Sequence, residues 1–344
     1  MKLLIVTQAV DRDDPVLGFF HQWLAEFATR FSQIHVVCLF EGSHALPENV
    51  VVHSLGKERG AASRTHYVFR FLRLAYTLRH EYDAVFIHMN PEYVAVAGDF
   101  WHFAKKPIGL WYNHEVGSIW LRLAQPFVKH LFHTSPFAYP ARYSNARLMP
   151  AGIDTSLFAA GSGVRSADTI YFQGRIAPAK RVHVLLEALR TLRRTRSATV
   201  TLVGPEDAAY GAQLRADFAD LIEEGAVTFL GARKNNETPR LYGAHAVSVN
   251  LTADGNFDKT VLESLSCETP VIVSSRAFAG IVDEAWTVPA GDAEALARAL
   301  LRLLALPEAA RHALGKKGRE MVAARHSLTS LADTLAESYG PEAH

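Results

Sequence analysis

The chain has 344 residues, 49% of them hydrophobic, and its 36 Lys and Arg against 35 Asp and Glu leave a formal net charge of +1. This length suggests two domains that each bury a core, and the balanced charge does not imply strong non-specific binding to nucleic acid. No apolar run approaches the length of a membrane span, and the N-terminus lacks the pattern of a signal peptide. Cys38 and Cys267 lie in or beside apolar stretches, which suits buried thiols in a reducing, cytoplasmic setting.

The first half of the chain alternates between short apolar runs and segments with helical periodicity. Strands are predicted at residues 2–6, 34–40, 50–55, 84–89 and 107–113. Helices are predicted at residues 15–31 and 65–82. Because strands separated by helices pair in parallel, this half predicts a doubly wound α/β domain of the αβα, Rossmann-like kind.

A stretch rich in glycine and small polar residues, 149–168, interrupts the alternation and is interpreted as a linker between domains. The pattern then resumes, with strands predicted at 169–174, 198–204, 227–231, 246–251 and 270–274. Helices are predicted at 182–194, 209–225, 237–245, 292–306 and 307–326, and another begins near residue 258.

The domain boundaries follow from this linker. We predict an N-terminal acceptor-binding domain over residues 1–150 and a second Rossmann-like domain over residues 151–325. A last amphipathic helix within residues 326–344 is expected to pack back on the N-terminal domain. Two such domains in tandem are expected to face a cleft, with ligands at the carboxyl ends of strands and beside helix N-termini.

The segment GRIAPAKR, which begins at Gly174, follows the first strand of the second half. Gly174 permits a tight turn, and Arg175 and Lys180 place two cations beside a helix start. A guanidinium fork and a mobile ammonium suit a diphosphate, although two solvated surface cations are an alternative interpretation. After the strand at 227–231, backbone groups of Ala232 and Arg233 could hold a nucleotide base.

The segment TADGNFDKTVLESLSCETPVIVSS spans residues 252–275 and predicts a loop, a helix and a buried strand. Asp258 can cap the helix, and the free N–H groups near Asp258, Lys259 and Thr260 would then form an anion site. One turn later, Glu263 could accept hydrogen bonds from a vicinal diol such as a ribose. Alternatively, Glu263 simply complements the helix dipole.

These motifs, in this order, resemble the C-terminal half of retaining glycosyltransferases of family GT4, one of the group 1 families, which have the GT-B fold. The likeness covers residues 150–340 and includes MPAGIDTSLF before GRIAPAKR and VPAGDAEALARAL near its end. It implies that Arg175 and Lys180 neutralise the diphosphate of a nucleotide-sugar donor of the UDP or GDP type, and that Glu263 holds the ribose. It also implies donor contacts from the loop of Asn256, Phe257 and Asp258, and a reaction without a metal ion.

The chain departs from the family pattern at two places. The first Glu of the E-x7-E motif would fall at Gly255, so a carboxylate that faces the sugar is missing. Asp254 or Asp258 could replace it, or backbone amides could suffice, while Lys259 is either an added phosphate cation or exposed to solvent. Glu268 stands where the family has a glycine, and a left-handed backbone there would cost about 1 kcal/mol.

Two histidines of the first half, His88 and His114, lie at the ends of predicted strands. The resemblance implies that His114 lies near the reacting carbon as a catalytic residue, whereas His88 is interpreted as a packed structural residue. Gly18, close to the start of the first helix, could let a phosphate approach its amides. The aspartates of DRDDPVLGFF do not predict a metal site, because one short loop supplies too few ligands for a hard cation.

The segment 57–80 is basic and partly amphipathic. It carries six cations, Lys57, Arg59, Arg64, Arg70, Arg73 and Arg79, against the single acid Glu58. Such a segment could make a peripheral contact with an anionic membrane and collect a lipid-linked acceptor, or form a core helix with a solvated basic face.

The resemblance therefore predicts a cytoplasmic glycosyltransferase, at most peripheral on the inner face of a membrane. It would move a sugar from a nucleotide-diphospho-sugar to a hydroxyl acceptor with retention of configuration, without a cofactor, in bacterial polysaccharide or glycolipid synthesis. A non-catalytic nucleotide-sugar-binding subunit is one alternative, suggested by the missing Glu. A sugar-nucleotide epimerase of the same fold is another, although no pair of cleft carboxylates is evident.

Overall fold

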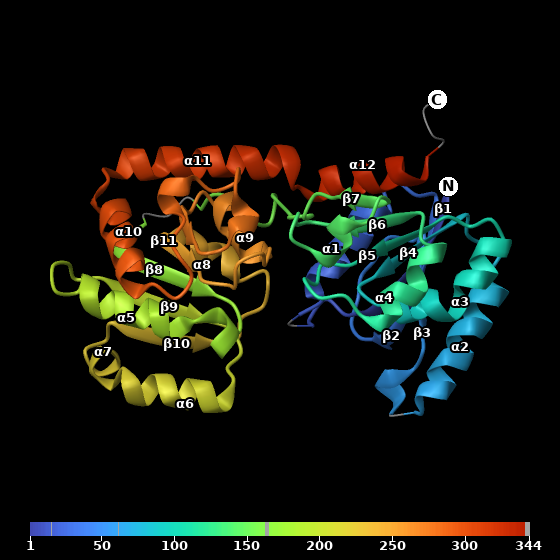
Figure 1. The fold of residues 1–344 in the computed structure, drawn as a ribbon, viewed down its shortest axis with the longest axis horizontal. Coiled ribbons are helices and arrows are strands. Elements are labelled where there is room, and N and C mark those ends of the chain that lie inside the picture. The colour runs from blue at the N-terminus through green and yellow to red at the C-terminus, as the bar shows by residue number, and fades with distance from the viewer. Residues whose placement is uncertain (15, 61, 162–164, 341–344) are drawn as a thin grey trace. The chain divides into compact units, whose positions relative to one another are not determined.

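A computed structural model describes residues 1–14, 16–60, 62–161 and 165–340. The chain forms two compact units, Met1–Gly152 with the segment from Leu328, and Ile153–Ser327. Figure 1 shows each unit as a parallel sheet covered by helices, which is the α/β class that the sequence predicts. Residue 15 of the first predicted helix, residues 162–164 of the linker and residues 341–344 of the terminal segment lie outside the described residues.

The first unit contains a seven-stranded sheet with the order β3-β2-β1-β4-β5-β6-β7. Its strands are β1 Lys2–Val10, β2 Gln33–Glu41, β3 Val50–Ser54, β4 Ala84–His88, β5 Ile108–Trp111, β6 His130–His133 and β7 Ala146–Leu148. Every neighbouring pair is parallel. The strand order reverses between β1 and β4, the position where open sheets of this kind bind ligands.

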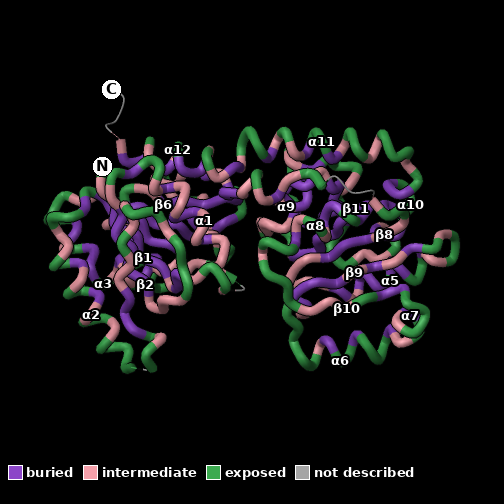
Figure 2. The backbone as a smooth tube through the Cα atoms, turned by 180° about the vertical axis from the view of Figure 1, so that it is seen from behind, coloured by how far each residue is buried: buried purple, intermediate pink, exposed green. Residues whose placement is uncertain are grey.

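Helices cover both faces of this sheet. They are α1 Gly18–Phe27, α2 Arg64–Thr77, α3 Pro91–Phe103, α4 Ile119–Ala124 and the distant α12 Leu328–Tyr339. Leu3 and Ile5 of β1 share a core with α1 and α12, whereas Leu4 and Val6 share a core with α2, α3 and α4. This alternation follows from the two-residue period of a strand. Figure 2 shows the buried strands inside each unit and exposed residues on the helices.

The helix α12 lies against α1, although some 300 residues separate them in sequence. Arg30, just after α1, forms an ion pair with Asp333 at 2.6 Å, and Thr329 donates a hydrogen bond to Glu26. Leu331, Leu335 and Tyr339 of α12 are buried in the shared core.

The second unit contains a five-stranded parallel sheet with the order β10-β9-β8-β11-β12. Its strands are β8 Ser166–Gln173, β9 Thr199–Val203, β10 Val227–Gly231, β11 His245–Asn250 and β12 Val271–Val273. Its helices are α5 Val182–Leu192, α6 Ala208–Asp217, α7 Ala219–Glu223, α8 Thr238–Ala244, α9 Lys259–Ser266, α10 Ala293–Ala305 and α11 Glu308–Arg325.

The sequence predicted the elements of the second unit more completely than those of the first. The helix predicted over 209–225 is divided at Phe218, whose backbone is not helical. The helices α3 and α4 and the strands β6 and β7 were not predicted. The helix α3 has apolar residues around much of its circumference, so its sequence shows no clear helical period. The strands β6 and β7 are short and contain His or Arg, so their sequences show no clear alternation.

Within the part of the chain that the structure describes, no helix combines the length and hydrophobicity needed to cross a membrane.

Candidate functional site

Three glycines line the carboxyl edge of the sheet in the second unit. Gly174, Gly204 and Gly231 end or follow β8, β9 and β10, and all three have positive φ angles. The Gly174 N–H donates to the Val203 carbonyl at 2.9 Å, and the Gly204 N–H donates to the Gly231 carbonyl at 3.0 Å. A Cβ atom on Gly204 would overlap the Gly174 carbonyl. The close approach of the loops after β8 and β9 therefore requires glycine at position 204.

The two predicted cations lie in the loop between β8 and α5. Arg175 is exposed, and Lys180 ends a 3₁₀ turn, Pro178–Lys180, directly before α5. Arg181 was not predicted as a site residue. It has a left-handed backbone with φ 47° and donates from its guanidinium to the Leu251 carbonyl at 3.1 Å. This contact joins the start of α5 to the end of β11. The only signal for Arg181 in the sequence is that it directly follows Lys180.

Asp258 is the N-cap of α9, as the sequence predicted. Its Oδ1 accepts a hydrogen bond from the Thr260 N–H at 3.3 Å. Its Oδ2 accepts from the ammonium of Lys180 and, at 3.1 Å, from the side-chain amide of Asn250. The Asp258 carboxylate therefore joins Lys180 to the N-terminus of α9.

Asn250, the last residue of β11, organises this cluster and was not predicted. It is buried, and its amide also donates to the Thr260 hydroxyl at 3.0 Å, while its carbonyl accepts from the Thr252 hydroxyl at 2.7 Å. Burial alone would raise the pKa of Asp258, but Lys180 and the hydrogen bonds from Asn250 and Thr260 outweigh it and leave this pKa below its ordinary value. Asp258 is therefore ionised at neutral pH.

Glu263 and Lys259 lie one turn apart on α9. Burial, followed by the nearby Asp258 carboxylate, raises the pKa of Glu263 to about 7, against the opposing effect of Lys259. Burial lowers the pKa of Lys259 to about 7, although Glu263 partly counters it. The Lys259 Nζ is shielded from solvent, so the alternative that it points into water is wrong. The hydroxyl of the buried Tyr242 lies 3.4 Å from Glu263 Oε2.

Gly255 occupies the position in the loop before α9 where the family motif has its first Glu. Gly255 has φ 92°, a left-handed conformation that a Glu would adopt only with strain, and its N–H donates to Ser275 Oγ at 3.0 Å. The neighbouring Asp254 forms an ion pair with Arg276 at 2.6 Å. The carboxylates of Asp254 and Asp258 are therefore both engaged by cations of the protein.

The remaining predicted residues of this unit are more exposed. Asn256 is exposed, and the Phe257 ring stacks on Phe278 with ring centroids 5.0 Å apart. Ala232 and Arg233 follow β10 and are both exposed. Gly231 is the last residue of β10, so the backbone groups of Ala232 and Arg233 lie just past the carboxyl edge of the sheet.

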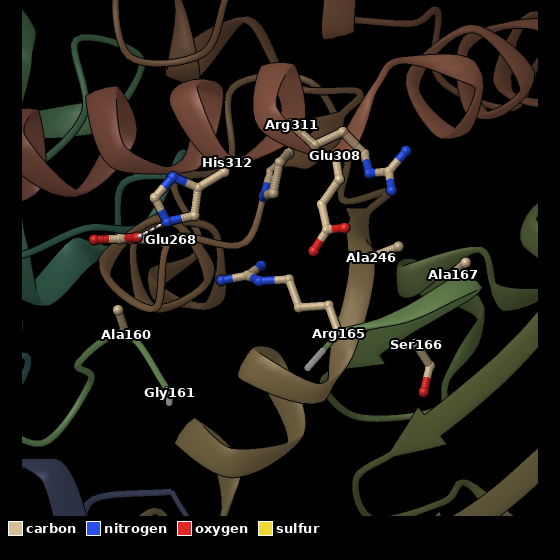
Figure 3. Close-up of a pocket in the computed structure, with 11 residues that line it drawn as sticks. Ala160, Gly161, Arg165, Ser166, Ala167, Ala246, Glu268, Glu308, Arg311 and His312 are labelled. Carbon is tan, nitrogen blue, oxygen red and sulfur yellow. Dashed lines mark ion pairs between the residues drawn. The ribbon is translucent and has the colours of Figure 1, made fainter. Parts of the chain in front are cut away.

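Glu268 follows the C-cap of α9 with φ 58°, which confirms the left-handed conformation expected there. Its carboxylate forms an ion pair with His312 of α11 at 3.3 Å. Both residues line a cavity of about 250 Å³ at the amino ends of β8 and β11, together with Arg165, Glu308 and Arg311. Figure 3 shows these charged side chains around it. Since none of the predicted site residues lines this cavity, it is separate from the site at the carboxyl edge.

Gly18 and His114 belong to the first unit. Gly18 begins α1, and a Cβ atom there would come within 3.0 Å of the Arg12 carbonyl, so close packing is one reason for this glycine. His114 is exposed in the loop after β5, and its carbonyl accepts from the Tyr139 N–H at 2.8 Å. His88 is buried and stacked on Phe20 at 4.4 Å, which agrees with a structural role.

Among the residues the structure covers, no three His, Cys, Asp or Glu side chains form a group that could hold a metal ion.

The chain resembles known glycosyltransferases in sequence and in fold. Residues 167–306 match the model of the family described as glycosyl transferases group 1. D-inositol 3-phosphate glycosyltransferase from Segniliparus rotundus is 25% identical over 222 residues, an alignment that covers 58% of this chain and 48% of that protein. The chain thus spans about half the length of this curated relative.

Solved structures match over nearly the whole chain. HepE (Alr3699) from Anabaena in complex with UDP superposes with a TM-score of 0.78 at 18% identity, covering 98% of this chain and 99% of HepE. Sucrose-phosphate synthase from Thermosynechococcus elongatus gives a TM-score of 0.74 at 21% identity, covering 98% of each chain. The chain has the GT-B fold. At these identities the likeness is one of fold, and the function is argued from the site.

Proposed function

We propose that the protein is a retaining glycosyltransferase, of the GT4 kind, that takes a sugar from a nucleotide-diphospho-sugar. The observation that carries the proposal is the arrangement at the start of α9. There Lys180, the capped helix N-terminus and Glu263 lie together at the carboxyl edge of the sheet. The match of residues 167–306 to group 1 glycosyltransferases supports it.

The chemistry we propose is stabilisation of a leaving nucleoside diphosphate. Arg175 and Lys180 would neutralise its charge at the N-terminus of α9. The N–H groups of Thr260 and Val261 in the first turn already donate to Asp258, so the expectation that free N–H groups there bind phosphate is wrong for these two residues. Glu263, with a pKa near 7, would accept hydrogen bonds from the ribose hydroxyls. The reaction would need no metal, and Gly18, Gly174, Ala232, Arg233 and the loop Asp254–Thr260 would complete the donor site.

The donor would be a UDP- or GDP-sugar, and the acceptor a hydroxyl group on a lipid-linked molecule of polysaccharide or glycolipid synthesis. HepE has been solved with UDP-glucose, which favours UDP as the first donor to test. We place the acceptor on the N-terminal unit, with His114 near the reacting carbon. Phe69, Leu72 and Tyr76 are exposed on α2, which supports a peripheral membrane contact through residues 57–80.

Incubation with UDP-, GDP- and ADP-sugars tests this function. We expect release of the nucleoside diphosphate with slow hydrolysis of the sugar, detected by chromatography and by NMR of the anomeric configuration. Lys180→Ala should lower this turnover by at least tenfold, which corresponds to about 1.4 kcal/mol of transition-state stabilisation. Lys316→Ala, an exposed lysine on α11, serves as the control.

The alternatives give different results in the same experiment. Binding without turnover, unchanged by Lys180→Ala, would favour a non-catalytic nucleotide-sugar-binding subunit. Conversion of one nucleotide-sugar into another, without release of the diphosphate, would favour an epimerase.

A further inference from the structure

The cavity at the amino edge of the second sheet has no part in the site proposed above. Its volume of about 250 Å³ is room for about eight water molecules. Sites for drug-sized ligands measure roughly 300–1,000 Å³, so this cavity suits a small metabolite and is too small for a nucleotide-sugar. Its charged lining residues are Arg165, Glu268, Glu308, Arg311 and His312.

The walls of this cavity are held by hydrogen bonds. The Arg165 guanidinium donates to the Thr269 hydroxyl and to the Cys267 carbonyl, both at 2.9 Å. The Arg311 guanidinium donates to the Leu304 carbonyl at 3.0 Å and so ties the start of α11 to the end of α10. The fold therefore places these cations in advance, which lowers the entropy cost of binding a ligand.

Most of the charges around the cavity are not paired with one another. Among the described residues, the lining side chains form a single ion pair, between Glu268 and His312. Figure 3 shows the Arg165 guanidinium and the Glu308 carboxylate turned toward the middle of the cavity, one from the start of β8 and the other from α11. A cation and an anion thus face the same space from opposite sides.

Arg165 retains hydrogen-bonding capacity and positive charge for a ligand. Its contacts with Thr269 and Cys267 leave the other N–H groups of the guanidinium to donate. Burial is the main cause that lowers the pKa of Arg165; Glu268 partly counters it, and the nearby Arg311 lowers the pKa further. A carboxylate or phosphate beside Arg165 would therefore be stabilised by two guanidinium groups.

Glu308 supplies the opposite charge. It lies in the first turn of α11, where the helix dipole favours a negative charge. A purely anionic ligand would meet the Glu308 carboxylate, and a purely cationic ligand would meet Arg165 and Arg311. A molecule that carries both charges complements both sides of the cavity.

We propose that this cavity binds a small zwitterion, with its carboxylate or phosphate on Arg165 and its ammonium on Glu308. Free amino acids carry an ammonium and a carboxylate, and phosphoethanolamine carries an ammonium and a phosphate. The apolar part of the wall, which faces the carbon atoms of such a ligand, comes from Ala160, Ala167, Ala246 and Pro270. This binding does not depend on the proposed function, because the donor site is at the opposite edge of the sheet.

Calorimetry of the full chain with a panel of small probes tests the proposal. Free amino acids and phosphoethanolamine are the zwitterions, and acetate, inorganic phosphate and methylamine are probes with charge of one sign. We expect at least one zwitterion to bind about tenfold or more tightly than every probe with one sign of charge. The bound zwitterion should also raise the midpoint of thermal unfolding as its concentration rises.

Variants of Glu308 identify the cavity as the place of binding. Glu308→Gln removes the partner of the ammonium and should weaken the zwitterion by about tenfold. Glu308→Lys should abolish zwitterion binding and create binding of inorganic phosphate, because both sides of the cavity are then cationic. Glu308 is exposed, so both variants should fold. Glu294→Gln, which removes an exposed acid from the first turn of α10, is the matched control and should bind the zwitterion as the wild type does.

Several results would overturn the proposal. They are no binding of any zwitterion in the panel, equally tight binding of acetate or methylamine, and zwitterion binding that Glu308→Gln leaves unchanged. Displacement of the zwitterion by UDP would also overturn it, because the ligand would then occupy the donor site. Failure of the chain to bind UDP would instead count against the proposed function and leave the zwitterion site in place.

Discussion

Asp258 holds the ammonium group of Lys180 with one carboxylate oxygen while it caps α9 with the other. The pair is largely buried, and Asn250 donates a further hydrogen bond at 3.1 Å to the oxygen that Lys180 contacts. An ammonium has three donors, so the contact with Asp258 leaves the others for the phosphates that we expect Lys180 to bind. Asp258 therefore determines where Lys180 points and how much net positive charge the site offers.

Asp258→Asn should separate these two effects. Asn is as good an N-cap as Asp, so α9 should be preserved, while the loss of a negative charge beside Lys180 should strengthen the binding of UDP by about two- to tenfold. Turnover of the donor should nevertheless fall about tenfold, because Lys180 loses the partner that orients it. Calorimetry with UDP and steady-state kinetics measure the two quantities.

Asp258→Ala is the matched comparison, since it removes the charge and the cap together. It should lower the free energy of unfolding by about 1 kcal/mol more than Asp258→Asn does. If Asp258→Asn weakened UDP binding as much as Asp258→Ala, the carboxylate would have only a structural role.

The elevated pKa of Glu263 should make stability depend on pH. Its folded pKa of about 7 exceeds the ordinary value of 4.5, so the folded chain binds more protons than the unfolded chain between these values. The stabilisation is complete below pH 4.5 and is lost as the pH rises through 7. The free energy of unfolding of Glu263→Gln should equal that of the wild type near pH 5 and exceed it by about 1–2 kcal/mol near pH 8. This magnitude is reduced because the Glu263 side chain is partly exposed.

Urea unfolding of both proteins at several pH values measures this difference. Glu320→Gln, on the exposed side of α11, should show no comparable trend and controls for the general loss of a carboxylate. A gap between Glu263→Gln and wild type that stays constant from pH 5 to pH 8 would contradict a raised pKa for Glu263.

The sequence predicted the helix start at Asp258 because capping is a local property that a short segment reveals. It could not predict that Asn250 and Lys180 meet at this carboxylate, because Lys180 is 78 residues away in sequence and the contact depends on how β8 and β11 pair. The burial of the Lys259 Nζ could not be predicted either, because it depends on the packing around α9 and not on the neighbouring residues in sequence. In the first unit, short strands such as β7 carry too few residues to show a period.

Glu268→Gly should stabilise the protein. Glu268 has φ 58°, and relief of that strain should outweigh the greater freedom of an unfolded glycine, for a net gain of about 0.5–1 kcal/mol. The lost ion pair with His312 contributes little, because the His312 side chain is mostly exposed. Glu268→Ala removes the ion pair and keeps the strain, so it should not stabilise. A lower midpoint of unfolding for Glu268→Gly than for Glu268→Ala would contradict this account.

Gly204→Ala and Gly231→Ala should differ sharply, although both glycines end neighbouring strands of one sheet. Gly231 has φ 69° with open space around a Cβ atom, so alanine there should cost only the left-handed strain, about 1–2 kcal/mol. At Gly204 the added Cβ would overlap the Gly174 carbonyl in addition to strain at φ 145°, and we expect a loss of at least about 3 kcal/mol. Because Gly174 directly precedes Arg175, the displaced loop should also weaken UDP binding in Gly204→Ala but not in Gly231→Ala. Urea unfolding and UDP calorimetry check both parts. Equal behaviour of the two variants would contradict the close approach of the loops after β8 and β9.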